Sequence, residues 1–151
     1  MSRSPVVIVG VGNTLRGDDA VGPIVIERLG EVAGAQLFDA GPAPENFLDP
    51  VTELAPDRIL FVDACDFRAA PGEFRVFEMP DIERLSAGLV STHTLPLTMT
   101  AQLFTAGGAR VSLLGIQPRS LEFGAPLSGP VVQALPAVLA AVRAWVAGPA
   151  T

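Results

Sequence analysis

The segment Val6–Gly22 limits the possible folds of this chain more than any other stretch. Its first six residues, Val6–Val11, form a continuous apolar run rich in β-branched side chains, which is typical of a strand buried on both faces. Closely spaced glycines follow, and then a stretch with helical periodicity. The segment therefore predicts a strand, a tight turn and a helix, which is the repeating unit of a parallel sheet.

The turn in this segment resembles a phosphate-binding loop in spacing but not in chemistry. Gly12 and Gly17 have the separation found in a P-loop. Asp18 and Asp19 stand where that loop has a lysine and a serine or threonine. Because two carboxylates repel a phosphate and attract a cation, the turn indicates metal chemistry and argues against nucleotide binding.

Strand-like and helix-like stretches alternate along the rest of the chain. This alternation predicts one domain over residues 1–151, with helices on both faces of a mostly parallel, twisted sheet of about five strands. The expected fold is a single three-layer α/β/α sandwich. The expected strands are Val6–Val11, Gln36–Asp39, Arg58–Val62, Phe74–Phe77 and Arg110–Ile116.

Capping residues and breakers predict the helices. Asp18 or Asp19 would cap a first helix that ends near Leu29, where Gly30 follows. The last helix follows Ser128 and carries an apolar stripe of Val131, Leu135, Val138, Val142 and Trp145. The other expected helices are Asn46–Leu54, a single turn at Asp81–Leu85, and Leu95–Thr105.

Composition excludes several classes of function. The single cysteine, Cys65, excludes an internal disulfide and a cysteine-rich metal site, and the absence of lysine excludes Schiff-base catalysis. The net charge is −6 and the arginines are scattered, so no nucleic-acid surface is expected. With no signal peptide and no uninterrupted apolar run of about 18 residues, we expect a cytoplasmic protein without a membrane partner.

Three polar side chains are expected to meet at one edge of the sheet. Asp19 follows the first strand, Asp63 ends the third with Asp66 just beyond it, and His93 lies in a loop before a helix. Ligand sites of open parallel sheets form outside the carboxyl ends of the strands. Two carboxylates and one imidazole form a reasonable ligand set for a borderline divalent metal.

Each of these residues also has a structural explanation. Asp19 could cap a helix, Asp63 could be an ordinary turn residue, and a lone histidine is more often structural than catalytic. Asp39 could accept a hydrogen bond from the backbone that follows it, as in a turn. No residue of this set is specific by itself.

Three segments together carry a specific resemblance. Their order and spacing are similar to those of the [NiFe]-hydrogenase maturation endopeptidases, and the resemblance covers nearly the whole chain. The segments are Gly10–Asp19, Leu60–Asp66 and Ser91–Leu97. Further segments look most like the branch that processes the large subunit of hydrogenase 3: Gly41–Asn46, Pro71–Glu73 and Gly115–Pro118.

The resemblance implies a defined reaction. Proteases of this family remove a C-terminal extension from the hydrogenase large-subunit precursor after nickel has been loaded. It implies that Asp19, Asp63 and His93 are the catalytic and metal-contacting residues, and that Asp39 and Gly41 belong to a substrate-side loop. Nickel would be supplied by the substrate, with no organic cofactor, and the enzyme would act on the large-subunit precursor as a monomer.

Three residues depart from the pattern of the family or bear on a rival nucleophile. Ala20 and Arg68 stand where glycine is frequent in the family. Cys65 occupies a variable position, which weakens the case for a cysteine nucleophile.

The main alternative function is a nickel-dependent chaperone that binds the precursor without cutting it. A dinucleotide site would need a third glycine two residues earlier than Gly17, and the chain has no Gly-x-Ser-x-Gly motif of a serine hydrolase.

Overall fold

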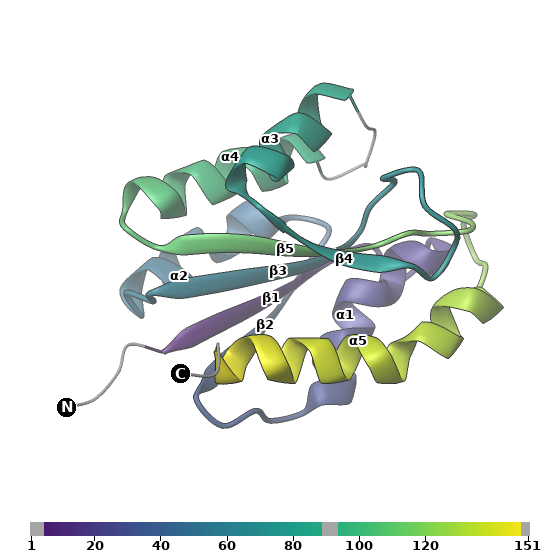
Figure 1. Ribbon diagram of the computed structural model, residues 1–151, viewed down its shortest axis with the longest axis horizontal. Helices are drawn as coiled ribbons and strands as arrows, with labels where there is room; N and C mark the ends of the chain where they lie inside the picture. The colour runs from purple at the N-terminus through teal and green to yellow at the C-terminus, as the bar shows by residue number, and fades with distance from the viewer. Residues whose placement is uncertain (1–4, 89–93, 149–151) are drawn as a thin grey trace.

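A computed structural model describes residues 5–88 and 94–148, and the side chains of residues 5–84 and 98–148. One five-stranded sheet runs through the domain, in the order β2-β1-β3-β5-β4 (Figure 1). The strands β1, β2, β3 and β5 are parallel, and β4 is antiparallel to β5. Their bounds are β1 Val6–Val11, β2 Ala35–Gly41, β3 Arg58–Ala64, β4 Phe74–Glu78 and β5 Arg110–Ile116.

Helices cover both faces of the sheet, so the three-layer sandwich predicted from the sequence is confirmed. The helices α1 (Val21–Leu29) and α5 (Gly129–Ala147) pack on one face. The other face carries α2 (Leu48–Glu53), α3 (Met79–Gly88) and α4 (Thr94–Ala106) (Figure 1). Successive residues of each central strand enter opposite layers. In β3, for example, Phe61 packs toward α4 and Val62 toward α1 and α5.

The predicted strands are all present, whereas three helix predictions needed correction. The region expected as one helix over Asn46–Leu54 is a 3-10 helix, Pro44–Phe47, followed by the short α2. The single turn expected at Asp81–Leu85 is the ten-residue α3. Pro80 does not prevent that helix, because a proline in the first turn removes an N–H that has no helical partner there. Ile82 of α3 is buried against the sheet.

The third correction concerns the start of the first helix. The chain forms a 3-10 helix, η1 (Gly17–Ala20), before α1 begins, and neither element has a side-chain cap. Gly17 has a φ of 56°, in the left-handed region that favours glycine. The predicted capping role of Asp18 or Asp19 is therefore wrong, and both carboxylates have other partners.

The helix α5 is more apolar than its position on the surface layer would suggest. By length and composition alone it could cross a membrane, although Gln133 and Arg143 interrupt its apolar run. Its predicted stripe explains this composition. Val131, Leu135, Val138 and Val142 are buried against the sheet, and Trp145 packs beside them.

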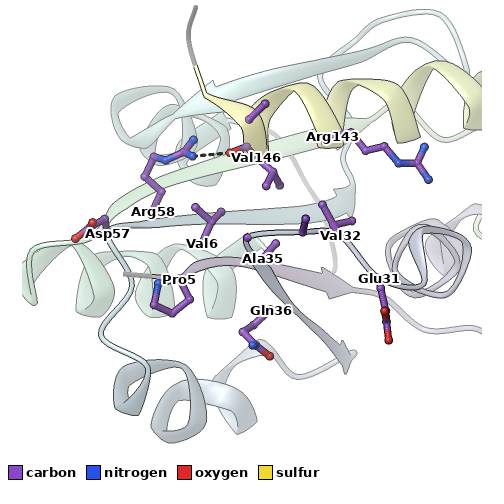
Figure 2. A pocket seen from close by; sticks show the side chains of 13 residues that line it. Pro5, Val6, Glu31, Val32, Ala35, Gln36, Asp57, Arg58, Arg143 and Val146 are labelled. Carbon is purple, nitrogen blue, oxygen red and sulfur yellow. Dashed lines mark hydrogen bonds between the residues drawn. The ribbon is translucent and has the colours of Figure 1, made fainter. Parts of the chain in front are cut away.

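An open groove of about 970 Å³ lies at the amino ends of the parallel strands. Val6, Ala35 and Arg58, the first residues of β1, β2 and β3, line it (Figure 2). Because parallel strands all start at the same edge, this groove lies across the sheet from the carboxyl ends. It is therefore remote from the acids that the sequence singled out.

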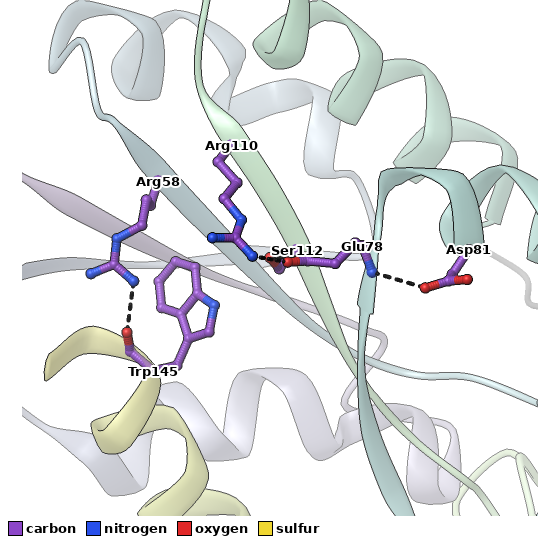
Figure 3. Close-up of polar contacts among 6 residues, drawn as sticks. All are labelled: Arg58, Glu78, Asp81, Arg110, Ser112 and Trp145. Atoms are coloured by element: carbon purple, nitrogen blue, oxygen red, sulfur yellow. Dashed lines mark hydrogen bonds and ion pairs between the residues drawn. The ribbon is translucent and has the colours of Figure 1, made fainter. Parts of the chain in front are cut away.

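Arg58 joins the sheet to the end of α5 beside this groove. Its guanidinium donates to the carbonyl oxygens of Trp145 and Val146 at 2.7 and 3.0 Å, and lies 4.6 Å from the centroid of the Trp145 ring (Figure 3). Arg58 thereby supplies donors to two carbonyls of the last turn of α5, of which that of Trp145 also accepts from the Gly148 N–H at 3.2 Å. At the amino end of β5, Glu78 of β4 accepts from Arg110 and Ser112.

Candidate active site

The sheet changes its winding direction between β1 and β3. From β1 the chain continues to β2 on one side, and then returns to place β3 on the other side of β1. Ligands of open α/β sheets bind outside the carboxyl ends of strands at such a point. Asp19 lies in η1, which follows β1 and contacts β3, and Asp63 is the last residue but one of β3. The two acids therefore belong to one edge of the sheet, as the sequence predicted.

Both acids are buried, with 2% of Asp19 and 1% of Asp63 exposed. Carboxylates are rarely buried unless they are hydrogen-bonded, paired or bound to a metal. In an environment of low polarity, the attraction between a carboxylate and a cation is also stronger than in water. A pair of buried acids at this edge is therefore suited to hold or sense a cation.

The turn Gly12–Asn13 positions the carboxylate of Asp19. The Asn13 N–H donates to Oδ2 of Asp19 at 3.0 Å. A Cβ at Gly12 would lie 1.9 Å from the carbonyl oxygen of Asp19, so no other residue fits there. The Gly12 N–H donates to the carbonyl oxygen of Gly41, which joins the turn to the end of β2. The turn Gly12–Asn13 therefore holds the Asp19 carboxylate in one orientation.

Asp18 has a different partner set from its neighbour. Its carboxylate accepts from the N–H groups of Arg119 and Ser120 at 2.8 and 3.2 Å. It also accepts from the N–H and hydroxyl of Ser128, at 2.7 and 2.8 Å. Asp18 is therefore a buried anchor for the segment 119–128. No local sequence pattern indicated this role, because the donors are more than 100 positions away.

The segment after β3 is held by a residue that sequence reasoning did not single out. Gln117, at the end of β5, accepts through Oε1 from the N–H groups of Phe67 and Ala69 at 2.9 and 3.1 Å. Its Nε2 donates to Oδ1 of Asp66 at 3.2 Å, and the same oxygen accepts from the Arg68 N–H. Asp66 is therefore a turn residue. The only signal for Gln117 was its place within the Gly115–Pro118 segment.

Asp39 and Gly41 form a turn at the carboxyl end of β2. Oδ1 of the exposed Asp39 accepts from the Gly41 N–H at 2.9 Å, which confirms the turn that the sequence allowed. Their role as a substrate-side loop stays a prediction. His93 lies outside the described residues, and within residues 5–88 and 94–148 no group of three His, Cys, Asp or Glu could hold a metal.

Comparison with known proteins identifies the family. A sequence profile described as hydrogenase maturation protease matches residues 24–145. The chain is 33% identical to the hydrogenase 3 maturation protease of Escherichia coli K12 over 141 residues, 92% of this chain and 89% of that protein. The chain belongs to the hydrogenase maturation protease family.

Solved structures of hydrogenase maturation proteases share the fold. The solution structure of the endopeptidase HycI from Escherichia coli matches with a TM-score of 0.83 at 33% identity, covering 93% of this chain and 90% of that one. The crystal structure of the [NiFe] hydrogenase maturation protease HycI from Thermococcus kodakarensis matches with a TM-score of 0.81 at 31% identity, covering 94% and 92%. The resemblance to the hydrogenase 3 branch is thus confirmed.

Cys65 is a poor nucleophile for a protease of this family. It is buried in the layer under α4, and burial, followed by the nearby charges of Asp63 and Asp66, raises the pKa of its thiol to about 12. At neutral pH only about one thiol in 10⁵ would be ionised, and the thiolate is the reactive form. The thiol is therefore best explained as part of the core.

Arg68 takes an unfavourable backbone conformation. Its φ is 61°, in the left-handed region that residues with a Cβ rarely adopt and that glycine adopts readily. We expect Arg68→Gly to raise the free energy of unfolding by about 0.5 kcal/mol, after the greater freedom of glycine in the unfolded chain is subtracted. Urea denaturation would measure the change.

A matched substitution tests whether the positive φ of Arg68 causes the expected gain in the free energy of unfolding. Arg119 is also exposed and lies in a loop, but it is not among the described residues with positive φ. Arg119→Gly should therefore lower the free energy of unfolding. Equal effects of the two substitutions would contradict the explanation.

Proposed function

We propose that this chain is an endopeptidase that removes the C-terminal extension of a [NiFe]-hydrogenase large-subunit precursor once nickel has been loaded. The observation that carries the proposal is the burial of Asp19 and Asp63 at the point where β1 and β3 diverge. Family membership supplies the reaction class, and these acids supply a chemical reason for a requirement for metal. His93 is the proposed third member of the set.

Nickel is part of the substrate in this proposal. Asp19 and Asp63 would offer oxygen ligands, and His93 a nitrogen ligand, to the ion exposed in the unfinished precursor. Carboxylate and imidazole groups together suit a borderline divalent metal. Since the attraction between a buried carboxylate and a cation is strong, a precursor without the ion would dock much more weakly. Metal loading would thus decide when the extension is removed.

Peptide hydrolysis also requires a base for the attacking water. A carboxylate of this pair can accept a proton from water that attacks the scissile carbonyl, and it can return the proton to the leaving amine. The bound ion can in addition polarise the carbonyl oxygen. The buried Cys65, whose thiol pKa is raised to about 12, takes no part in this scheme.

The test compares three forms of one precursor. The purified chain is incubated with precursor that is nickel-free, nickel-loaded or zinc-loaded, and the products are weighed by mass spectrometry. We expect loss of a C-terminal peptide only from the nickel-loaded form. Cleavage of all three forms would contradict the nickel requirement. Binding of the loaded precursor without cleavage would favour the chaperone alternative, and neither binding nor cleavage would overturn the proposal.

A further inference from the structure

Two large apolar side chains are exposed beside the acidic edge of the sheet. Phe123 is 74% exposed and Leu15 is 59% exposed. The Gly124 N–H donates to the carbonyl oxygen of Leu15 at 2.8 Å, so the two segments that carry these side chains lie against each other. Exposed apolar residues that are brought together at a functional edge often mark a site of protein contact.

Phe123 belongs to a loop that is closed at its base. Arg119 and Ser120 at the beginning of the segment, and Ser128 at its end, all donate to the buried carboxylate of Asp18. The Asp18 N–H in turn donates to the carbonyl oxygen of Ser120 at 2.9 Å. Because one buried acid ties both ends of the loop, the exposed position of Phe123 is imposed by the fold.

Leu15 is connected just as directly to the proposed catalytic acid. Its N–H donates to Oδ1 of Asn13 at 2.9 Å, and the Asn13 N–H donates to Asp19. A peptide segment whose scissile bond reaches Asp19 must therefore pass close to this turn. The charged residues near the pair in the sequence, Arg16, Arg119 and Glu122, are of both signs.

We propose that Leu15 and Phe123 bind an apolar side chain of the precursor segment next to the scissile bond, and so help to select the bond that is cut. This inference rests on the proposed function. The occupant is a segment of the protein substrate in extended conformation, because it must offer a side chain to the pair and a peptide bond to the acids at once. Burial of the apolar surfaces would supply the affinity.

The test compares truncation of each of the two side chains with a control truncation elsewhere on the surface, matched to Leu15 in residue type and exposure. Leu15→Ala and Phe123→Ala are each expected to raise KM for nickel-loaded precursor about tenfold, with kcat changed less than about twofold, because the contact is made equally in the ground and transition states. Leu103 is 57% exposed and lies next to Pro56 and Asp57, at the amino end of β3. Leu103→Ala should leave KM unchanged.

A binding measurement separates this inference from the proposed function. The Kd for nickel-loaded precursor, measured by calorimetry, should rise about tenfold in the Leu15 and Phe123 variants and stay unchanged in the Leu103 variant. If the wild-type chain binds but does not cut, the proposed protease function fails while this inference is still tested by the Kd values. Equal KM and Kd values for all three variants and the wild type would overturn it.

Discussion

Asp63→Asn is expected to lower the rate of precursor cleavage by at least about 1000-fold while the chain stays folded. The amide has nearly the size of the carboxylate, but it carries no charge and is a much weaker base and metal ligand. Asp63 is 1% exposed, so removal of its charge also removes a cost of burial. The same reasoning predicts a comparable loss for Asp19→Asn, whose amide oxygen can still accept from the Asn13 N–H.

Single-turnover cleavage of nickel-loaded precursor measures these losses, and circular dichroism and thermal unfolding verify the fold. Asp66 provides the control, since it is an exposed acid three residues from Asp63. In Asp66→Asn, the amide oxygen can still accept from the Arg68 N–H and Gln117 Nε2, so we expect a rate within about threefold of the wild type. Near wild-type cleavage by the Asp63 variant would contradict the site assignment.

Gly22→Ala is expected to have the largest effect on stability, lowering the free energy of unfolding by about 4 kcal/mol or preventing folding. Gly22 lies in the first turn of α1, where the helix crosses the ends of β1 and β3. A Cβ at this position would lie 2.2 Å from the carbonyl oxygen of Val11 and 2.5 Å from that of Val62. Both atoms are backbone of central strands, so neither can move without disturbing the sheet.

Gly129→Ala provides the matched control for this prediction. Gly129 is also a helical glycine, at the start of α5, but a Cβ there would meet nothing within 4 Å. Alanine favours a helix over glycine by up to about 1 kcal/mol, so this variant should be as stable as the wild type or slightly more stable. Urea denaturation of both variants gives the comparison. A Gly22 variant of wild-type stability would show that α1 can move away from the sheet.

Hydrophobic patterns predicted the sheet well. The strands Val6–Val11 and Arg110–Ile116 have the predicted bounds, because a strand buried on both faces reads as an uninterrupted apolar run. Helix boundaries were less predictable. The helix α3 packs through Ile82, which belongs to the same buried cluster as Val111 and Leu113 of β5, residues that are distant in sequence. The expected helix Asn46–Leu54 is divided at Phe47 into a 3-10 helix and α2. The Phe47 side chain packs edge to face against Phe38, a contact with a distant segment that a local pattern does not predict.

The sequence by itself determined the fold class, the family and the two acids that follow β1 and β3, because strand periodicity and motif spacing are local properties. Only the tertiary structure decided how the adjacent Asp18 and Asp19 divide their roles. Asp18 is committed to donors on Arg119, Ser120 and Ser128, and Asp19 to the turn at Asn13. Neighbouring side chains in a turn point in different directions, and their partners are known only once distant segments have packed together.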